Sequence, residues 1–314
     1  ATAAMFFAHS LPAIYICRLL AGIGAGGEYG VGIALIAENF EPHLIGRLTS
    51  VAAIGGQVGA IFAAIMAAYI IPHFGWNALF LLGIIPVILT FFIRRHVHES
   101  QEFIVAHKKT IANHQRISVS RLFATPRLAL QTLGLMVMTI VQIAGYFGLM
   151  NWLPSIVQKQ QGLSVSGSSI WMIATIIGMS IGMMVLGTVM DNWGPRWAFG
   201  IFLLGSATVM FTIPMVQSSI ALILAGALVG FFSNGMFGGY GAVISQLYPT
   251  AIRSTANSII MNVGRAIGGF SSVVIGLLMD HYSLGVTMGF LSALYILSFI
   301  VMSSLPGMRK LANH

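Results

Sequence analysis

Long apolar stretches are the feature that most constrains what this chain can fold into. Nine of them are long enough to cross a hydrocarbon core, which is roughly 30 Å thick. Only 7% of the residues are charged and 57% are apolar, and the mean hydropathy is +0.90. Soluble domains carry about 25% charged residues, so a water-soluble globule of this composition could not cover its surface. The sequence therefore predicts an all-α polytopic membrane protein. Its expected spans lie near residues 11–37, 48–71, 76–93, 128–157, 167–190, 196–216, 219–247, 255–280 and 285–305.

One long connection, residues 94–127, divides the chain. We expect residues 1–93 to form the remainder of an N-terminal helical half, and residues 128–314 a C-terminal half of six helices. The first ten residues are apolar but lack a basic segment, so we interpret them as the end of an earlier helix, not as a signal peptide. A membrane sensor would carry a large soluble signalling domain, and the connection is too short for one.

Basic residues indicate the orientation. Twelve of the fifteen Lys and Arg residues fall in the 94–127 linker, at the C-terminus, or in loops that lie on the same side as these two. The opposite loops hold only Lys159. The positive-inside rule then places the linker and the C-terminus in the cytoplasm, with the protein in the plasma (inner) membrane. The same bias explains the sequence pI near 10.0, so we expect no nucleic acid partner.

Gly22, Gly24 and Gly27 form a G-x-G-x-x-G pattern, which is typical of dinucleotide-binding loops. Such a loop follows a strand, whereas these glycines lie inside one apolar stretch. Gly22, Gly26 and Gly30 recur every four residues, a spacing that predicts a groove for close helix packing in lipid. A soluble NAD enzyme is therefore disfavoured. The same spacing occurs in three further pairs: Gly55 with Gly59, Gly178 with Gly182, and Gly264 with Gly268.

An internal repeat supports two related halves. The segment that begins GIGAGGEYG is similar to the segment VGFFSNGMFGGYG, at an offset of about 208 residues. In this alignment Glu38 falls on Gln246 and Gln57 falls on Arg265, so the two copies differ in charge at the same depth.

Several segments resemble the major facilitator superfamily, specifically its metabolite:proton symporters. The loop GTVMDNWGPR resembles the superfamily's G-x-x-x-D-x-x-G-x-R motif, RLLAGIGAGG its fourth-helix signature, and NVGRAIGG an eleventh-helix segment of organic-anion carriers. AENFEPHLIGR and SQLYPTAIR resemble the ends of the fourth and tenth helices. The resemblance implies that this chain holds helices three to twelve of a twelve-helix fold. It also implies a cytoplasmic charge lock at Gly187, Asp191 and Arg196, which Glu38, Arg47 and Arg253 would join.

Three ionisable residues fall inside predicted spans, where a charge is costly and usually functional: Arg18, Glu28 and Arg265. Glu28 is placed near mid-span, where loss of hydration favours the protonated carboxyl. We therefore expect it to couple proton movement to transport, with Arg18 on the same helix; a structural hydrogen bond is the alternative. Arg265 lies three residues after Asn262 and suits capture of a carboxylate. An ion pair with an acid outside this chain segment is the alternative.

Other polar residues within the spans are candidates for lining a substrate cavity, although each could equally form an interhelical hydrogen bond. They are Gln57, Gln142, Tyr146, Asn151, Asn234 and Tyr240. We interpret Trp152 and Trp171 as residues of the membrane interface.

The chain shows neither metal-ligand spacing nor a catalytic constellation, so we expect no cofactor, no metal and no enzymatic activity. The sequence favours a monomeric carrier that moves a small organic anion with protons by alternating access. A carrier of neutral sugars, polyols or osmolytes is the alternative.

Overall fold

The computed structural model describes residues 1–8, 10–96, 119–161, 165–216, 218–305 and 307–308. These residues form helices and turns, with no strand among them. Eight described helical segments are long and apolar enough to cross a membrane, and Trp76–Phe92 is a shorter apolar one. Helices are expected here, because a backbone in hydrocarbon must satisfy its N–H and C=O groups within the segment.

The N-terminal part consists of two long helices and a broken third segment. Ser10 caps the first long helix by accepting a hydrogen bond from the Ala13 N–H at 3.4 Å. In order, the elements are η1 (Ala3–Phe7), α1 (Leu11–Asn39), η2 (Pro42–Leu44), α2 (Ile45–Phe74), α3 (Trp76–Leu79), η3 (Phe80–Gly83) and α4 (Ile84–His96).

The C-terminal part is a bundle that packs around fully buried aromatic side chains, among them Trp171, Phe199 and Tyr240. Its elements are η4 (Val119–Phe123), α6 (Pro126–Gln161), α7 (Val165–Trp193), α8 (Pro195–Val209), α9 (Thr212–Met215), α10 (Ser219–Val229), η5 (Gly230–Asn234), α11 (Phe237–Leu247), α12 (Thr250–Gly268), α13 (Ser271–His281) and α14 (Leu284–Ser304).

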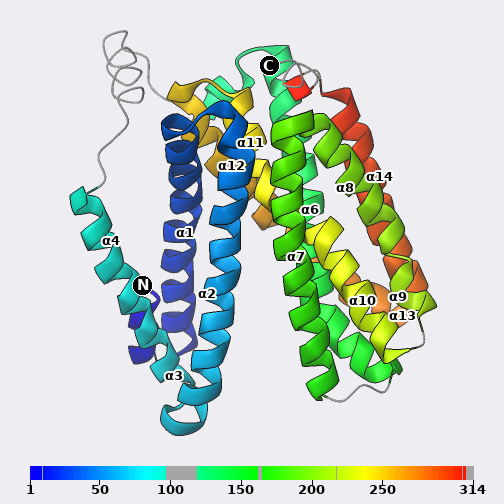
Figure 1. Ribbon diagram of the computed structural model, residues 1–314. Helices are drawn as coiled ribbons and strands as arrows, with labels where there is room; N and C mark the ends of the chain where they lie inside the picture. The colour runs from blue at the N-terminus through cyan, green and yellow to red at the C-terminus, as the bar shows by residue number, and fades with distance from the viewer. Residues whose placement is uncertain (9, 97–118, 162–164, 217, 306, 309–314) are drawn as a thin grey trace.

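The two parts meet along α1 and α2. Helix α1 packs on α12 and α11, and α2 packs on α7 and α11. Figure 1 shows α2 and α7 close together near the turn that joins α1 to α2, and diverging toward their other ends. We call the first of these the Asp191 end, after the residue that joins the helices there. The division of the chain at residues 94–127 stays a prediction, because 97–118 lie outside the described residues.

The glycines of α1 lie inside a helix, where two of them pack on α12, and do not form a nucleotide-binding loop. Gly22, Gly24 and Gly27 lie within one continuous helix, with no strand before them among the described residues. A Cβ at Gly30 would meet Ser258 and the Ser254 carbonyl of α12, and one at Gly26 would meet Asn262. The packing prediction is confirmed at these two positions. At Gly22 a Cβ would meet no atom within 4 Å among the described residues, so the packing of this glycine stays a prediction.

The other three glycine pairs divide in the same way. Gly178 and Gly182 of α7 approach the backbone of Ala227 and Phe231, and Gly264 and Gly268 of α12 approach α6, as predicted. At Gly55 and Gly59 of α2 a Cβ would meet nothing within 4 Å among the described residues, so the packing of this pair stays a prediction.

Candidate functional site

A central cavity lies between the two parts, where α1 and α2 face α6, α7, α11 and α12. It consists of two adjoining hollows of about 450 Å³ and about 1030 Å³, which share Gln57, Tyr146, Phe237 and Arg265. Cavities of this size suit small molecules, and their mostly apolar walls with a few polar groups are typical of ligand sites. The smaller hollow is lined by Gln57, Ile143, Tyr146, Phe147, Met179, Phe237, Arg265, Gly269 and Ser272.

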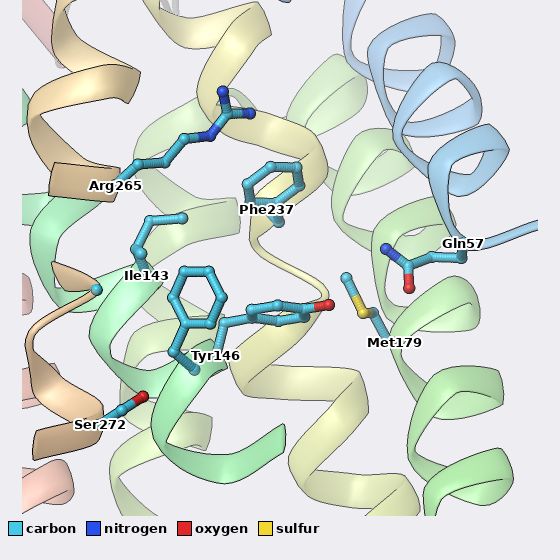
Figure 2. A pocket seen from close by; sticks show the side chains of 9 residues that line it. Gln57, Ile143, Tyr146, Met179, Phe237, Arg265 and Ser272 are labelled. Atoms are coloured by element: carbon cyan, nitrogen blue, oxygen red, sulfur yellow. The ribbon is translucent and has the colours of Figure 1, made fainter. Parts of the chain in front are cut away.

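Arg265 is the cationic residue of both hollows. Figure 2 shows its side chain reaching into the cavity beside Phe237. Its guanidinium carbon lies over the ring of Tyr29, 5.4 Å from the centroid. Among the described residues no carboxylate forms an ion pair with it. The guanidinium is therefore held by an aromatic ring without being neutralised.

Gln57 and Tyr146 supply neutral polar groups to the same cavity. Gln57 comes from α2 and Tyr146 from α6, and Figure 2 shows the amide and the hydroxyl pointing toward the same space. The structure therefore brings these two residues and Arg265, all three predicted substrate-binding residues, to one cavity. Their role in binding stays a prediction.

Asn262 lines the larger hollow and also closes its edge. Its Nδ2 donates a hydrogen bond of 2.9 Å to the Gly26 carbonyl oxygen, across the contact between α12 and α1. Gly26 has no side chain, so the amide can reach the helix backbone. The residue therefore joins the two parts directly beside the cavity.

Three other predicted cavity residues lie elsewhere, in the interior of the C-terminal bundle. Gln142 is buried and its Nε2 donates to the Ser233 carbonyl at 2.8 Å, within the π-helical turns of η5. Tyr240 donates to the Met138 carbonyl at 3.1 Å, and Asn234 is fully buried in η5. None of the three lines either hollow. Gln142 and Tyr240 therefore form interhelical hydrogen bonds, which was the alternative to lining the cavity, and Asn234 is buried away from both hollows. The Asn151 side chain lies outside the described part.

Glu28 and Arg18 lie on different parts of α1. Glu28 lines the larger hollow and is exposed among the described residues, and its role in proton coupling stays a prediction. Arg18 lies about one turn before Gly22, the first residue of α1 that lines the larger hollow. Its guanidinium carbon is 5.6 Å from the centroid of the Phe80 ring. As expected from their ten-residue separation, no ion pair joins them.

Asp191 joins α7 to the first turn of α2 at the end that bears its name. Its carboxylate accepts hydrogen bonds from the backbone N–H groups of Gly46 at 2.9 Å and Arg47 at 3.0 Å. The Arg47 Nε is 3.7 Å from the same carboxylate, whose side chain is only 2% exposed. A carboxylate at a helix N-terminus is stabilised by the helix dipole as well as by the two donors. The sequence placed Asp191 in a loop, whereas it lies in the last turn of α7.

The glycines of the same motif are explained by geometry. A Cβ at Gly187 would meet the Gly46 carbonyl and Ser50, so only glycine lets α7 approach α2 this closely. Gly194 turns the chain from α7 into α8 with a φ of 85°, which disfavours any residue with a side chain. Arg196 lies in the first turn of α8, partly buried, with no ion pair among the described residues.

The remaining charge-lock candidates lie near Asp191. Glu38 is in the last turn of α1 and Arg253 in the first turn of α12, and both are partly buried. Because Gly30 packs on Ser254, these turns of α1 and α12 lie side by side. Arg47 is the predicted member that Asp191 contacts directly.

Sequence reasoning missed Tyr29 and Phe237, which form the wall beside Arg265. Their rings lie 6.2 Å apart. The available signal for Tyr29 was its position next to Glu28, whereas nothing in the local sequence singles out Phe237.

The interface prediction for Trp171 is wrong, because this side chain is fully buried against Gly226. Trp152 is partly buried and donates to the Ser272 carbonyl at 2.7 Å, so it packs α6 on α13. The described residues contain no group of three or more His, Cys, Asp or Glu that could hold a metal ion.

Comparison with known proteins identifies the family. The sequence profile of the Major Facilitator Superfamily matches residues 1–182 and again residues 135–310. The chain belongs to this superfamily. It is therefore a multi-pass membrane transporter and not an enzyme, and the expected partial major facilitator fold is confirmed.

Individual relatives agree with this assignment. A Haemophilus influenzae protein named for metabolite transport is 36% identical over 293 residues, covering 91% of this chain and 72% of the relative. A Cupriavidus pinatubonensis protein named for 4-methylmuconolactone transport is 31% identical over 314 residues, covering 98% and 72%. The solved structure of the proton:xylose symporter XylE with 6-bromo-6-deoxy-D-glucose superposes with a TM-score of 0.78. It is 20% identical and covers 94% of this chain and 71% of XylE.

Proposed function

We propose that this superfamily member carries a small organic anion, a carboxylate, together with protons by alternating access. The observation that carries the proposal is the Arg265 guanidinium, which faces the cavity and has no carboxylate partner among the described residues. A guanidinium binds a carboxylate through two parallel hydrogen bonds, and a cation inside a membrane span is rarely retained without a function. The apolar and aromatic walls beside it suit the body of such a substrate.

Glu28 is the proposed proton-coupling residue. It lines the larger hollow together with Arg265, so the carboxyl and the proposed anion-binding group face the same cavity. A proton on Glu28 and an anion at Arg265 would each favour one state of the carrier through unequal affinity for the two states. Arg18 lies on the same helix and is the weaker candidate for this role.

The Asp191 end is the proposed cytoplasmic gate. The positive-inside rule places this end in the cytoplasm of a plasma-membrane protein. With the helices joined there, the cavity would then be open to the outside. Opening inward would require Asp191 to leave the first turn of α2, so Asp191 and Arg47 act as the lock and Gly187 permits the contact.

A second candidate function is transport of neutral sugars, polyols or osmolytes. The neutral hydrogen-bonding groups of Gln57 and Tyr146 in the cavity favour it, and the fold match is to a xylose symporter. In that case Arg265 would have only a structural role.

Uptake into proteoliposomes with an imposed pH gradient tests the proposal. The full-length protein would be assayed with benzoate, cis,cis-muconate, sialic acid and xylose. Hydrogen bonds to a charged group contribute about 1.5–3 kcal/mol, so we expect Arg265→Gln to weaken carboxylate affinity about 10- to 100-fold. Arg127→Gln is the control, because Arg127 is an equally charged, exposed residue at the start of α6. Xylose uptake that Arg265→Gln leaves unchanged, without any carboxylate uptake, would contradict the proposal.

The same vesicles test the proton coupling. Glu28→Gln should retain substrate exchange without a gradient but lose the accumulation that the pH gradient drives. Glu41→Gln, which removes an exposed carboxylate outside the cavity, should retain both. Gradient-driven accumulation by Glu28→Gln at the wild-type level would exclude Glu28 as the coupling residue.

A further inference from the structure

Tyr29 of α1 lies between Arg265 of α12 and Phe237 of α11 at the wall of the cavity. It lies on α1, next to Glu28, and lines the larger hollow. Its ring faces the Arg265 guanidinium of α12 at 5.4 Å and the Phe237 ring of α11 at 6.2 Å. This partly buried side chain of α1 therefore contacts two other helices, α11 and α12, beside the proposed anion-binding group.

The contact with Arg265 leaves the guanidinium available for an anion. An aromatic ring attracts a cation through its face and carries no formal charge, so it compensates Arg265 without competing as a carboxylate would. The N–H donors lie along the edge of the guanidinium, and a carboxylate binds at that edge. A ring on the face and a carboxylate at the edge can therefore be bound at the same time.

The contact also fixes where the guanidinium lies. Arg265 has a long side chain with many rotamers, and binding an anion requires it to lie in one of them. The α1–α12 contact beside the ring is itself fixed, because the Asn262 Nδ2 donates to the Gly26 carbonyl at 2.9 Å. Gly26 precedes Tyr29 by three residues, and Asn262 precedes Arg265 by three. The ring is thus held by the same helix pair that carries the guanidinium.

We propose that Tyr29 is a positioning residue for the substrate anion: its ring, placed by α1, holds the Arg265 guanidinium of α12 with its hydrogen-bonding edge toward the cavity. This proposal rests on the proposed function, because it assigns the partner of the anion-binding group. It adds that affinity for the anion depends on an uncharged aromatic ring of the N-terminal part, which faces a guanidinium of the C-terminal part.

Conservative and non-conservative replacements of Tyr29 provide the test. Tyr29→Leu removes the ring, and we expect the KM for carboxylate uptake to rise at least about threefold, with a smaller change in maximal rate. Tyr29→Phe and Tyr29→Trp keep an aromatic face and should stay near the wild-type KM. A role limited to packing would instead lower the amount of folded carrier and the maximal rate. Equal KM values for Tyr29→Leu and Tyr29→Phe would overturn the proposal.

A second measurement needs no substrate. Phenylglyoxal modifies accessible arginines, and mass spectrometry of the peptide that contains Arg265 gives the rate at this one residue. We expect Tyr29→Leu to change that rate at least about threefold while Tyr29→Phe does not, because only the former frees the guanidinium. Arg196, outside the cavity, is the internal reference. An unchanged rate in Tyr29→Leu overturns the positioning role. A changed rate, with carboxylate uptake that survives Arg265→Gln, would instead overturn the proposed function.

Discussion

At the scale of single residues, the position of a charged side chain relative to the helix ends decides whether it joins helices or faces the cavity. Asp191 is almost fully buried, yet both carboxylate oxygens accept backbone N–H donors that the first turn of α2 would otherwise leave unpaired. Arg265, by contrast, lies beside the aromatic rings of Tyr29 and Phe237, has no carboxylate partner among the described residues, and faces the cavity. The first arrangement favours a contact between helices, and the second favours capture of a ligand.

Replacing Asp191 should loosen the contact between α7 and α2. Asp191→Asn keeps one acceptor oxygen and loses the charge; each lost charged hydrogen bond is worth about 1.5–3 kcal/mol, so the ratio of joined to separated helices should fall at least about tenfold. Spin labels at the exposed residues His43 and Trp193 would report the separation as a population of longer distances. Asp280→Asn, an exposed carboxylate in the last turn of α13, is the control. An unchanged distance distribution in Asp191→Asn would show that the carboxylate does not hold the helices together.

At the scale of helices, close approach depends on particular glycines. Along α1, Gly30 lies against the backbone of α12, whereas a Cβ added at Gly24 would meet no atom within 4 Å among the described residues. Glycines of one helix therefore occur both at close helix contacts and at positions without a neighbouring helix among the described residues. Helix α1 is an uninterrupted α-helix, while its repeat partner passes through the π-helical turns Gly230–Asn234, where Gln142 pairs with a backbone carbonyl.

Alanine at these two glycines should have opposite effects on stability. Gly24→Ala gains up to about 1 kcal/mol of helix propensity, so the unfolding midpoint should stay equal or rise. Gly30→Ala forces a methyl group against Ser258 and the Ser254 carbonyl, and overpacking of this kind costs about 1–3 kcal/mol. Thermal unfolding in detergent would compare the two variants directly. A midpoint for Gly30→Ala as high as that of Gly24→Ala would mean that α1 and α12 need not approach this closely.

At the scale of the whole molecule, the helices are joined at one end and diverge toward the other. Gly46, in the first turn of α2, lies against Asp191 and the Gly187 carbonyl of α7, whereas the open glycines Gly55 and Gly59 lie further along α2. Which end faces the cytoplasm decides whether the cavity opens outward.

Single cysteines determine the orientation. With Cys17 replaced by Ser, Glu41→Cys places a thiol at the Asp191 end and Tyr282→Cys places one in the turn between α13 and α14, at the opposite end. We expect a membrane-impermeant maleimide to label Tyr282→Cys in right-side-out vesicles and Glu41→Cys only in inside-out vesicles. The chain without cysteine is the control. The reverse labelling would place the Asp191 end outside and overturn the proposed cytoplasmic gate.

The sequence by itself determined the class of fold. Apolar stretches of spanning length in a chain with few charges leave helices in a bilayer as the solution, and glycines inside such a stretch cannot form a nucleotide-binding loop. It also identified Arg265, Gln57 and Tyr146 as polar residues at cavity depth, because an ionisable or polar side chain inside a span stands out against its neighbours.

Only the tertiary structure decided which polar residues meet. Gln142 lies one helical turn before Tyr146, yet one pairs with a carbonyl inside the bundle and the other faces the cavity. The ring of Tyr29 meets Arg265 from a distant part of the chain. In the neighbouring contact, 236 positions separate Gly26 from Asn262. Hydropathy and spacing describe the depth of a residue along its own helix. The rotation of each helix about its axis is set by packing against the others, and that rotation selects the residues that form the site.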